Sequence, residues 1–216
     1  MDSTSKNSGM PATSRIRSWF WLLLFLNTLA GIAIISQEAP IFQELVGVTA
    51  VVAASMVGIA SIGNAVGRVF WAWVSDSITR RMTFLVMFLI QVLLFWLLAN
   101  SHMVAGTTLL TFIVLMCYGG GFGTMPAFAA DYYGSKNVGP IYGLMLTAWG
   151  TASAVGPLMI AHLRQTTGSY HRPLHVIAVL MAISAVLPLL MFAPGPRTRR
   201  ETELDEPQSR PRSKAA

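Results

Sequence analysis

The chain has 216 residues, of which 54% are hydrophobic and only 11% are charged. A soluble domain carries about 25% charged residues, and the mean hydropathy here is +0.57. This composition excludes an ordinary soluble domain and predicts an integral membrane protein. The net charge of +6 could indicate a nucleic-acid partner. However, the basic residues gather at the termini and in short turns without interleaved aromatic residues, so we expect a lipid bilayer and no nucleic acid as the partner.

Six apolar runs follow one another along the chain, and each is long enough to be a membrane span. They cover residues 19–40, 46–74, 82–99, 104–130, 138–163 and 173–192. The polar stretches 1–18 and 194–216 have the composition of disordered segments. The sequence therefore predicts an all-α membrane protein, with six transmembrane helices forming one domain over residues 19–193.

The basic residues are distributed unevenly between the two sides that six spans define. Arg164 and Arg172 lie on one side and Arg68 lies within a span, whereas every other Lys and Arg lies on the side of the termini. Because cytoplasmic loops carry the excess of Lys and Arg, both termini are predicted to be cytoplasmic. The expected location is the plasma membrane, which is the inner membrane of a bacterium.

Small residues recur at the intervals that allow close helix packing in lipid. Gly63 and Gly67 are four residues apart, as are Gly139 and Gly143, and Ala148, Ala152 and Gly156 repeat the spacing. The simpler interpretation is packing alone. The alternative is that these faces slide or rock during transport.

Glycine and proline also interrupt the fourth run, at Gly119, Gly120, Gly121, Gly123 and Pro126. The spacing does not match a nucleotide-binding glycine loop. In a membrane helix such residues free backbone groups that neighbouring helices or a wet cavity must satisfy. We therefore expect a bent or broken helix beside a pathway, and kinks at Pro157 and Pro188.

The sequence contains no motif for catalysis, for a metal or for a cofactor, so an enzyme is not predicted. His162, His171 and His175 lack supporting carboxylates and are expected to be interface residues. Glu38 lies near the end of the first run, where its side chain can reach the interface, and a functional role is the alternative. With so few acidic residues in the spans, no proton-coupling residue is evident.

Arg68 lies inside the second run, six residues before Val74, or about 9 Å from the end of the run at the helical rise. A cation at that depth is costly in lipid. Three roles stay open: a structural or gating partner for the Asp76 region, an anion-binding group, or a side chain that snorkels to the interface. Seven other polar or amphipathic residues are candidates to line a cavity, although such residues more often form interhelical hydrogen bonds. They are Asn27, Gln37, Asn64, Tyr118, Tyr142, Thr147 and Trp149.

A charged turn joins the second and third runs. It holds Asp76, Arg80 and Arg81 and follows Gly67 in the sequence GRVFWAWVSDSITRR. This stretch resembles the cytoplasmic-loop signature of the major facilitator superfamily, in which a Gly, an Asp and paired basic residues join two helices of each six-helix half. The resemblance implies that the turn is a cytoplasmic gate or latch.

Residues 118–157, YGGGFGTMPAFAADYYGSKNVGPIYGLMLTAWGTASAVGP, resemble the oxalate–formate antiporter family within that superfamily. The first run, with LLLFLNTLAGIAIISQEAP, is similar to the first helix of the C-terminal half of its members. The resemblance implies that the six runs are helices seven to twelve of a twelve-helix secondary transporter. Such transporters move small carboxylates by alternating access, as two halves rock about a midplane site.

Two departures from the family pattern matter for the expected function. The first six-helix half of the family pattern is absent. Three interpretations of the chain stay open: a fragment of a longer transporter, a truncated or non-transporting subunit that binds a partner half, or a half that pairs with another chain or with a second copy of itself. Oxalate exchangers of the family carry a substrate lysine in the fifth of these spans, where Trp149 stands, and Arg68 matches their substrate arginine. One cation suits a monocarboxylate better than a dianion. The expected pocket residues are Arg68, Asn27, Tyr118, Tyr142 and Trp149.

Overall fold

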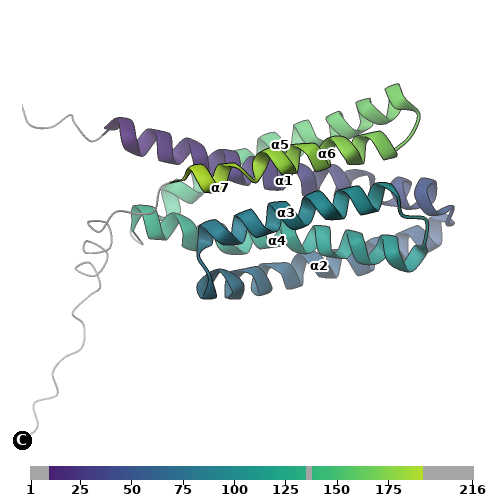
Figure 1. Cartoon of the computed structure of the whole chain (residues 1–216), viewed down its shortest axis with the longest axis horizontal. Coiled ribbons are helices and arrows are strands. Elements are labelled where there is room, and N and C mark those ends of the chain that lie inside the picture. Colours follow the sequence, from purple (N-terminus) through teal and green to yellow (C-terminus); the bar gives the residue numbers. More distant parts are fainter. Residues whose placement is uncertain (1–9, 135–137, 192–216) are drawn as a thin grey trace, which may run out of the picture.

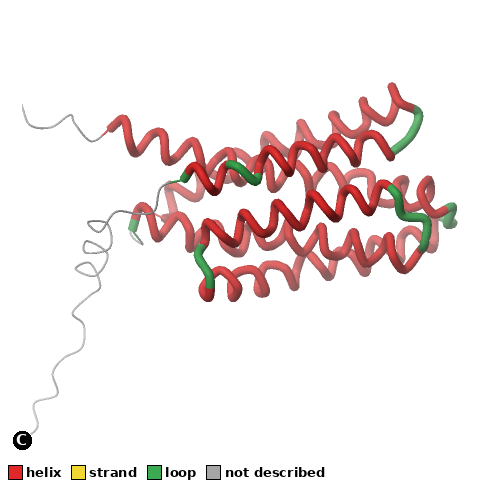
Figure 2. Tube along the Cα trace, in the orientation of Figure 1, coloured by secondary structure: helices red, strands yellow, loops and turns green. Residues whose placement is uncertain are grey.

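The computed structural model describes residues 10–134 and 138–191, with side chains from Ser18 onward. Every regular element in this part of the chain is a helix (Figures 1 and 2). The helices are α1 (Met10–Val46), α2 (Ala50–Ser77), α3 (Arg80–Ala99), α4 (Val104–Tyr133), α5 (Val138–Thr167), α6 (His171–Ser184) and α7 (Leu187–Leu190). Six stretches, with α6 and α7 counted as one, are long and apolar enough to cross a membrane. The predicted all-α fold with six spans is therefore confirmed.

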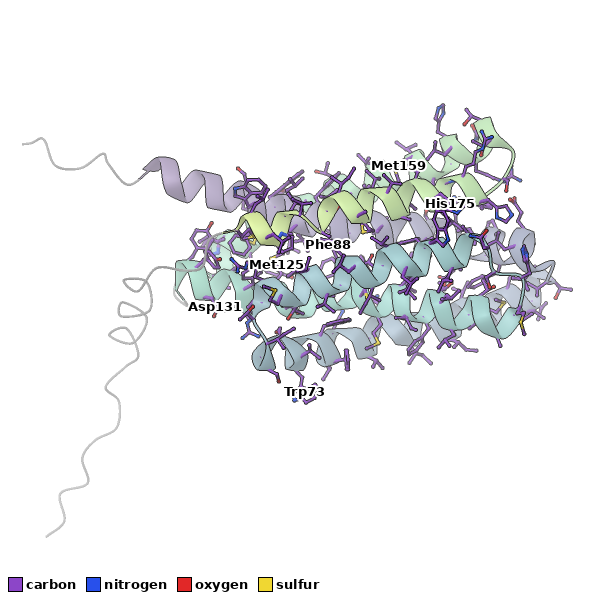
Figure 3. All side chains as sticks on the ribbon, in the orientation of Figure 1. Trp73, Phe88, Met125, Asp131, Met159 and His175 are labelled. Atoms are coloured by element: carbon purple, nitrogen blue, oxygen red, sulfur yellow. The ribbon has the colours of Figure 1, made fainter. Side chains whose placement is uncertain are left out.

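Successive spans run in opposite directions, with α6 and α7 forming one span, so the bundle has two ends (Figure 1). We call the end where α1 begins and α7 ends the terminal end; it also holds the turn between α2 and α3. The opposite end, which holds the connections α1–α2, α3–α4 and α5–α6, is the distal end. Figure 3 labels Asp131 near the terminal end and His175 toward the distal end.

The first helix is longer than predicted at both of its ends. It begins at Met10, within the stretch expected to be disordered, and residues 1–9 and 192–216 lie outside the described part. It also continues through Pro40, where the first run was predicted to end. A proline removes one backbone hydrogen bond, but Ile41, Phe42 and Leu45 beyond it are buried, and their burial favours continuing the helix. Gly47, with φ of 70°, then turns the chain.

The most extensive helix contact is between α2 and α4, and glycines make it possible. A Cβ atom added at Gly63 would overlap the Phe112 carbonyl oxygen, and one at Gly67 would overlap that of Met116. On α4, Gly119 and Gly123 lie equally close to the backbone of α2. We call these four positions the glycine seam. The fourth helix is not broken as one alternative predicted, because α4 is continuous from Val104 to Tyr133 with Pro126 inside it; the predicted bend stays a prediction.

The second most extensive contact joins α1 and α5. Ala148, Ala152 and Gly156 face α1 from α5 and are buried, as their spacing predicted. Gly139 and Gly143 differ, because a Cβ atom at either would meet no described heavy atom within 4 Å. Their expected packing contact is therefore not made within the described chain.

The prolines of the last two spans behave differently from each other. Pro157 lies inside α5, which is continuous. Pro188 lies in the first turn of α7, just after the sixth span breaks between Ser184 and Leu187. Figure 2 shows this break as a short loop between two helical segments. The sixth span is therefore interrupted just before Pro188, where a kink was predicted.

Two of the six spans leave most of their surface uncovered. In the most apolar stretch of α2 and of α5, 28% of the residues are buried, against 44–56% for the other spans. Trp73 on α2 projects away from the bundle (Figure 3). The bundle therefore presents large apolar surfaces on α2 and α5, as expected of helices in contact with lipid or with another membrane helix.

Candidate functional site

Arg68 lies on the exposed surface of α2, directly after a glycine of the seam. Its guanidinium carbon is 5.6 Å from the centroid of the Phe122 ring on α4, a cation–π arrangement. Its carbonyl oxygen is the atom that a Cβ at Gly123 would overlap, so the seam fixes its backbone against α4. Among the described residues it has no carboxylate partner.

Three of the predicted pocket residues gather around this arginine. The Trp149 Nε1 of α5 donates a hydrogen bond to the Tyr118 hydroxyl of α4, at 3.4 Å. Tyr118 also packs edge-on against Phe122, with ring centroids 5.3 Å apart. Arg68 lies close enough to Tyr118 and to Tyr142 of α5 to interact electrostatically with both hydroxyls. We call these five residues, contributed by α2, α4 and α5, the arginine–aromatic face.

Asn27 does not belong to this face, although the sequence grouped it with the other pocket residues. It is fully buried on α1, where its Nδ2 donates to the Tyr118 carbonyl oxygen at 3.3 Å and its Oδ1 accepts from Gln91 of α3 at 3.3 Å. It therefore holds three helices together behind Tyr118. The sequence missed Phe122, although it stands four residues after Tyr118 and so on the same side of a helix.

A second group of polar residues ties α2, α3 and α4 together at the terminal end and reaches the residue that follows α7. Arg80 Nη1 lies 2.5 Å from the Asp76 carboxylate and also donates to the Ser75 hydroxyl, and its Nε lies 3.4 Å from Asp131 of α4. Arg81 donates to the Met191 carbonyl oxygen at 2.5 Å. We call Ser75, Asp76, Arg80, Arg81 and Asp131 the terminal cluster; they line a cavity of about 410 Å³. The charge partner of Asp76 is thus Arg80, and Arg68 makes no ion pair with the Asp76 region among the described side chains.

A third group, at the distal end, carries no motif, and Gln37 is its only member that was named as a candidate from the sequence. Glu44 of α1 accepts from Arg164 of α5 at 2.7 Å and from the backbone N–H of Tyr170 at 2.7 Å. The Tyr170 hydroxyl donates to Gln37 at 2.8 Å, and Arg164 lies over the tyrosine ring. Burial raises the pKa of Tyr170, with the Arg164 guanidinium opposing and the Glu44 carboxylate adding to that rise. These four residues form the distal cluster.

The histidines near the distal end make structural contacts. His171 contacts the carbonyl oxygen of Ala99, and His175 packs against the Trp96 ring with centroids 4.6 Å apart. Among the described residues, no group of three or more His, Cys, Asp or Glu side chains is placed to hold a metal ion.

Glu38 differs from its sequence-based expectation. The side chain does not reach the interface, because the residue is only 3% exposed. Its Oε1 has no hydrogen-bond partner among the described residues. The reason is that α1 continues past Pro40 to Val46, which places Glu38 inside the span and not at its end.

The fold and these groups define a six-helix integral membrane protein with a cation on an uncovered helix face. The sequence model of the Major Facilitator Superfamily matches residues 12–215. The chain therefore belongs to the Major Facilitator Superfamily.

Several named proteins share sequence with the chain. It is 30% identical over 139 residues to the oxalate:formate antiporter of Oxalobacter formigenes, covering 63% of this chain and 33% of that protein. It is 28% identical over 149 residues to the sialic acid transporter NanX of Escherichia coli strain K12, and this match covers 67% of this chain and 36% of that protein. A 72-residue stretch is 32% identical to the apicoplast pyruvate carrier 2 of Toxoplasma gondii, and this match covers 33% of this chain and 11% of that protein.

The chain spans about a third of the length of the first two relatives. All three relatives are named as transporters or carriers, and none as an enzyme. Family membership and these names agree with the prediction that the chain is not an enzyme.

Proposed function

We propose that the chain is one six-helix half of a secondary transporter that moves a small organic anion, such as a monocarboxylate, by alternating access. Membership of the Major Facilitator Superfamily supports the transport mechanism. The proposal does not require the chain to act alone, since the relatives are about three times its matched length.

Arg68 is the observation that carries this proposal. A cation in an apolar span is costly, and such residues usually pair with a carboxylate or serve a binding site. Arg68 has no carboxylate partner among the described side chains, and it lies on an uncovered surface. An anionic substrate would supply the missing negative charge.

The aromatic residues around Arg68 favour a small anion with one charge. Tyr118 and Tyr142 offer hydroxyl groups near the guanidinium, and Trp149 offers an N–H group that now binds Tyr118. A single cation neutralises one carboxylate but leaves half of a dianion unpaired. Oxalate, formate, pyruvate and sialic acid, which appear in the names of the relatives, all carry a carboxylate. Within that class the arginine–aromatic face favours the monocarboxylates.

The partner that completes the site is a second six-helix half, supplied by another chain or by a second copy of this one. The uncovered surfaces of α2 and α5 support this proposal, as do Gly139 and Gly143, which meet open space within the described chain. The alternative is a membrane subunit that binds a partner half without transporting. In either case the excess of Lys and Arg on the side of the termini favours a cytoplasmic location for the terminal end. The terminal cluster would then serve as a latch on the cytoplasmic side.

The test is uptake of radiolabelled formate, pyruvate and oxalate by cells that express the chain with its partner half. We expect Arg68→Gln to reduce monocarboxylate uptake by about tenfold or more, because it removes a charge–charge contact worth at least about 1.4 kcal/mol. Arg172→Gln, which changes an exposed arginine at the distal end, is the matched control. Unchanged uptake with Arg68→Gln would reject this arginine as the anion site. Association of the two halves without any uptake would favour the non-transporting subunit.

A further inference from the structure

Glu38 is a buried acid that the proposed anion site does not use. It lies eight residues before the end of α1, or about 12 Å into the helix, and is 3% exposed. Its Oε1 has no hydrogen-bond partner within the described part of the chain. An ionised carboxylate in such surroundings is far more costly than the neutral acid. In this conformation the neutral, protonated form of the carboxyl group is therefore the favoured one.

The helices around α1 offer Glu38 no fixed positive charge. Residues 50–63 of α2 and 104–116 of α4, in the distal parts of these helices, include no titratable side chain. The titratable and charged side chains of α5 and α6 toward the distal end are His162, Arg164, His171, Arg172 and His175. Arg164 is bound to Glu44, His171 contacts a backbone carbonyl, His175 stacks on Trp96, and Arg172 is exposed. A proton is thus the simplest means of neutralising Glu38.

The distal cluster holds the part of α1 that contains Glu38. Gln37, the preceding residue, accepts the hydrogen bond from the Tyr170 hydroxyl, and Glu44 binds Arg164 and the Tyr170 backbone. These bonds fasten the end of α1 to α5 and to the connection before α6. While they are intact, the carboxyl group stays in a dry environment.

Pro40 gives this part of α1 a place to move. A proline inside a helix has no N–H group, so the carbonyl group of Ser36 lacks its usual partner. Glu38 therefore lies inside the weakened turn between Ser36 and Pro40, and the bonds of Glu44 fasten the helix end that follows this turn. Release of the distal cluster would let the end of α1 swing at Pro40 and admit water to the carboxyl group.

We propose that Glu38 is a proton-binding site linked to the distal cluster: the acid is protonated while the cluster is closed and releases its proton to water when the cluster opens. The reaction is the loss or gain of one proton by one carboxyl group, and water at the distal end accepts or donates that proton. If the proposed function holds, a proton bound at Glu38 and an anion bound at Arg68 would cross together without net charge.

Infrared spectroscopy of the full chain in lipid nanodiscs tests the proton site without requiring transport. A protonated carboxyl group has a C=O stretching band that ionised carboxylates lack. We expect the wild type to show this band at neutral pH and Glu38→Gln to lose it, while Asp131→Asn, which changes an exposed acid of the terminal cluster, keeps it. Absence of the band from the wild type, or its persistence in Glu38→Gln, would overturn the proposal.

Two further variants separate protonation from folding and test the link to the distal cluster. Glu38→Asp keeps a carboxyl group and should keep a band, so a loss caused by misfolding alone is recognised. Glu44→Gln weakens the distal cluster, and the band should then disappear at a lower pH than in the wild type. An unchanged titration of the band in Glu44→Gln would reject the link.

The coupling itself is tested by uptake of labelled pyruvate under an imposed pH gradient. The gradient should stimulate uptake in the wild type and lose its effect in Glu38→Gln. Equal stimulation in both proteins would reject coupling through Glu38. If neither protein takes up pyruvate or formate, the proposed function fails, whereas the infrared band still decides whether Glu38 holds a proton.

Discussion

The two ends of the bundle are fastened by the same kinds of side chain but in different surroundings. At the terminal end, Arg80 bridges Asp76 and Asp131, whose side chains are 65% and 48% exposed. At the distal end, Glu44 is 25% exposed and accepts hydrogen bonds from both Arg164 and a backbone N–H group. Water competes more strongly for the terminal carboxylates, so each of their ion pairs contributes less to stability.

The two clusters also join different helices. The terminal cluster connects α2, α3 and α4, with Arg81 reaching Met191 just beyond α7. The distal cluster connects α1 with α5 and with the connection before α6. Loss of the terminal cluster would therefore loosen the contacts among α2, α3 and α4, whereas loss of the distal cluster would loosen the contact of α1 with α5. The following three variants test that difference.

The largest effect is expected for Glu44→Ala at the distal end. The change leaves Arg164 and the Tyr170 N–H group without their acceptor, and hydrogen bonds to a charged group contribute about 1.5–3 kcal/mol before exposure is considered. Since both side chains are partly exposed, we expect a loss of about 1–2 kcal/mol in the free energy of unfolding, measured by detergent denaturation in mixed micelles. Gln43→Ala, at an exposed neighbouring position of α1, is the control. Equal losses in the two variants would contradict the importance of the distal cluster.

A smaller effect is expected for Arg80→Ala at the terminal end. Exposed ion pairs contribute about 0.2–1 kcal/mol each, and we expect a loss of about 1 kcal/mol that shrinks at high salt. The same denaturation experiment at low and high ionic strength measures it, with Arg172→Ala as the exposed-arginine control. A loss larger than that of Glu44→Ala would reverse the ranking of the two ends.

The smallest effect is expected for Tyr170→Phe, and it depends on pH. Removing the hydroxyl deletes one hydrogen bond to Gln37, and we expect a cost of about 0.5 kcal/mol at neutral pH, the lower limit for a hydrogen bond between neutral groups. Burial raises the pKa of Tyr170 above its ordinary value of about 10. The folded state therefore holds the phenol proton more tightly than the unfolded state, and this stability, complete below about pH 10, is lost as the pH rises through the raised pKa.

Denaturation of both proteins at neutral and alkaline pH checks the sign of this effect. The stability of the wild type should fall more steeply above about pH 10 than that of Tyr170→Phe. Parallel declines would mean that the Tyr170 hydroxyl is not part of the distal cluster in solution.

The helices were predictable because each has a long apolar stretch bounded by polar residues. The exact ends were less predictable, since burial of Phe42 and Leu45 outweighs the breaking effect of Pro40. The continuation of α1 past Pro40 also explains why Glu38 is buried. A residue expected at the end of a helix reaches water, whereas the same residue several positions inside it is buried.

The candidate site was predictable in part. Residue types alone indicated Arg68, Tyr118, Tyr142 and Trp149, and the structure brings them close together. The same reasoning grouped Asn27 with them, because sequence does not reveal which face of a helix a polar residue occupies when its partners lie on two other helices. Of the distal cluster only Gln37 was named from the sequence, because Arg164 lies 120 positions from Glu44 and no spacing rule connects them.

The glycine seam has a mechanical consequence for any movement of this bundle. Because the backbones of α2 and α4 lie so close at Gly63, Gly67, Gly119 and Gly123 that no methyl group fits between them, we expect these two helices to move together. Arg68 lies on α2 and Tyr118 on α4, so we expect their separation to change little in such a movement. Tyr142 and Trp149 sit on α5, whose contact with α4 is limited. A displacement of α5 relative to α2 and α4 would then widen or narrow the space in front of the Arg68 guanidinium.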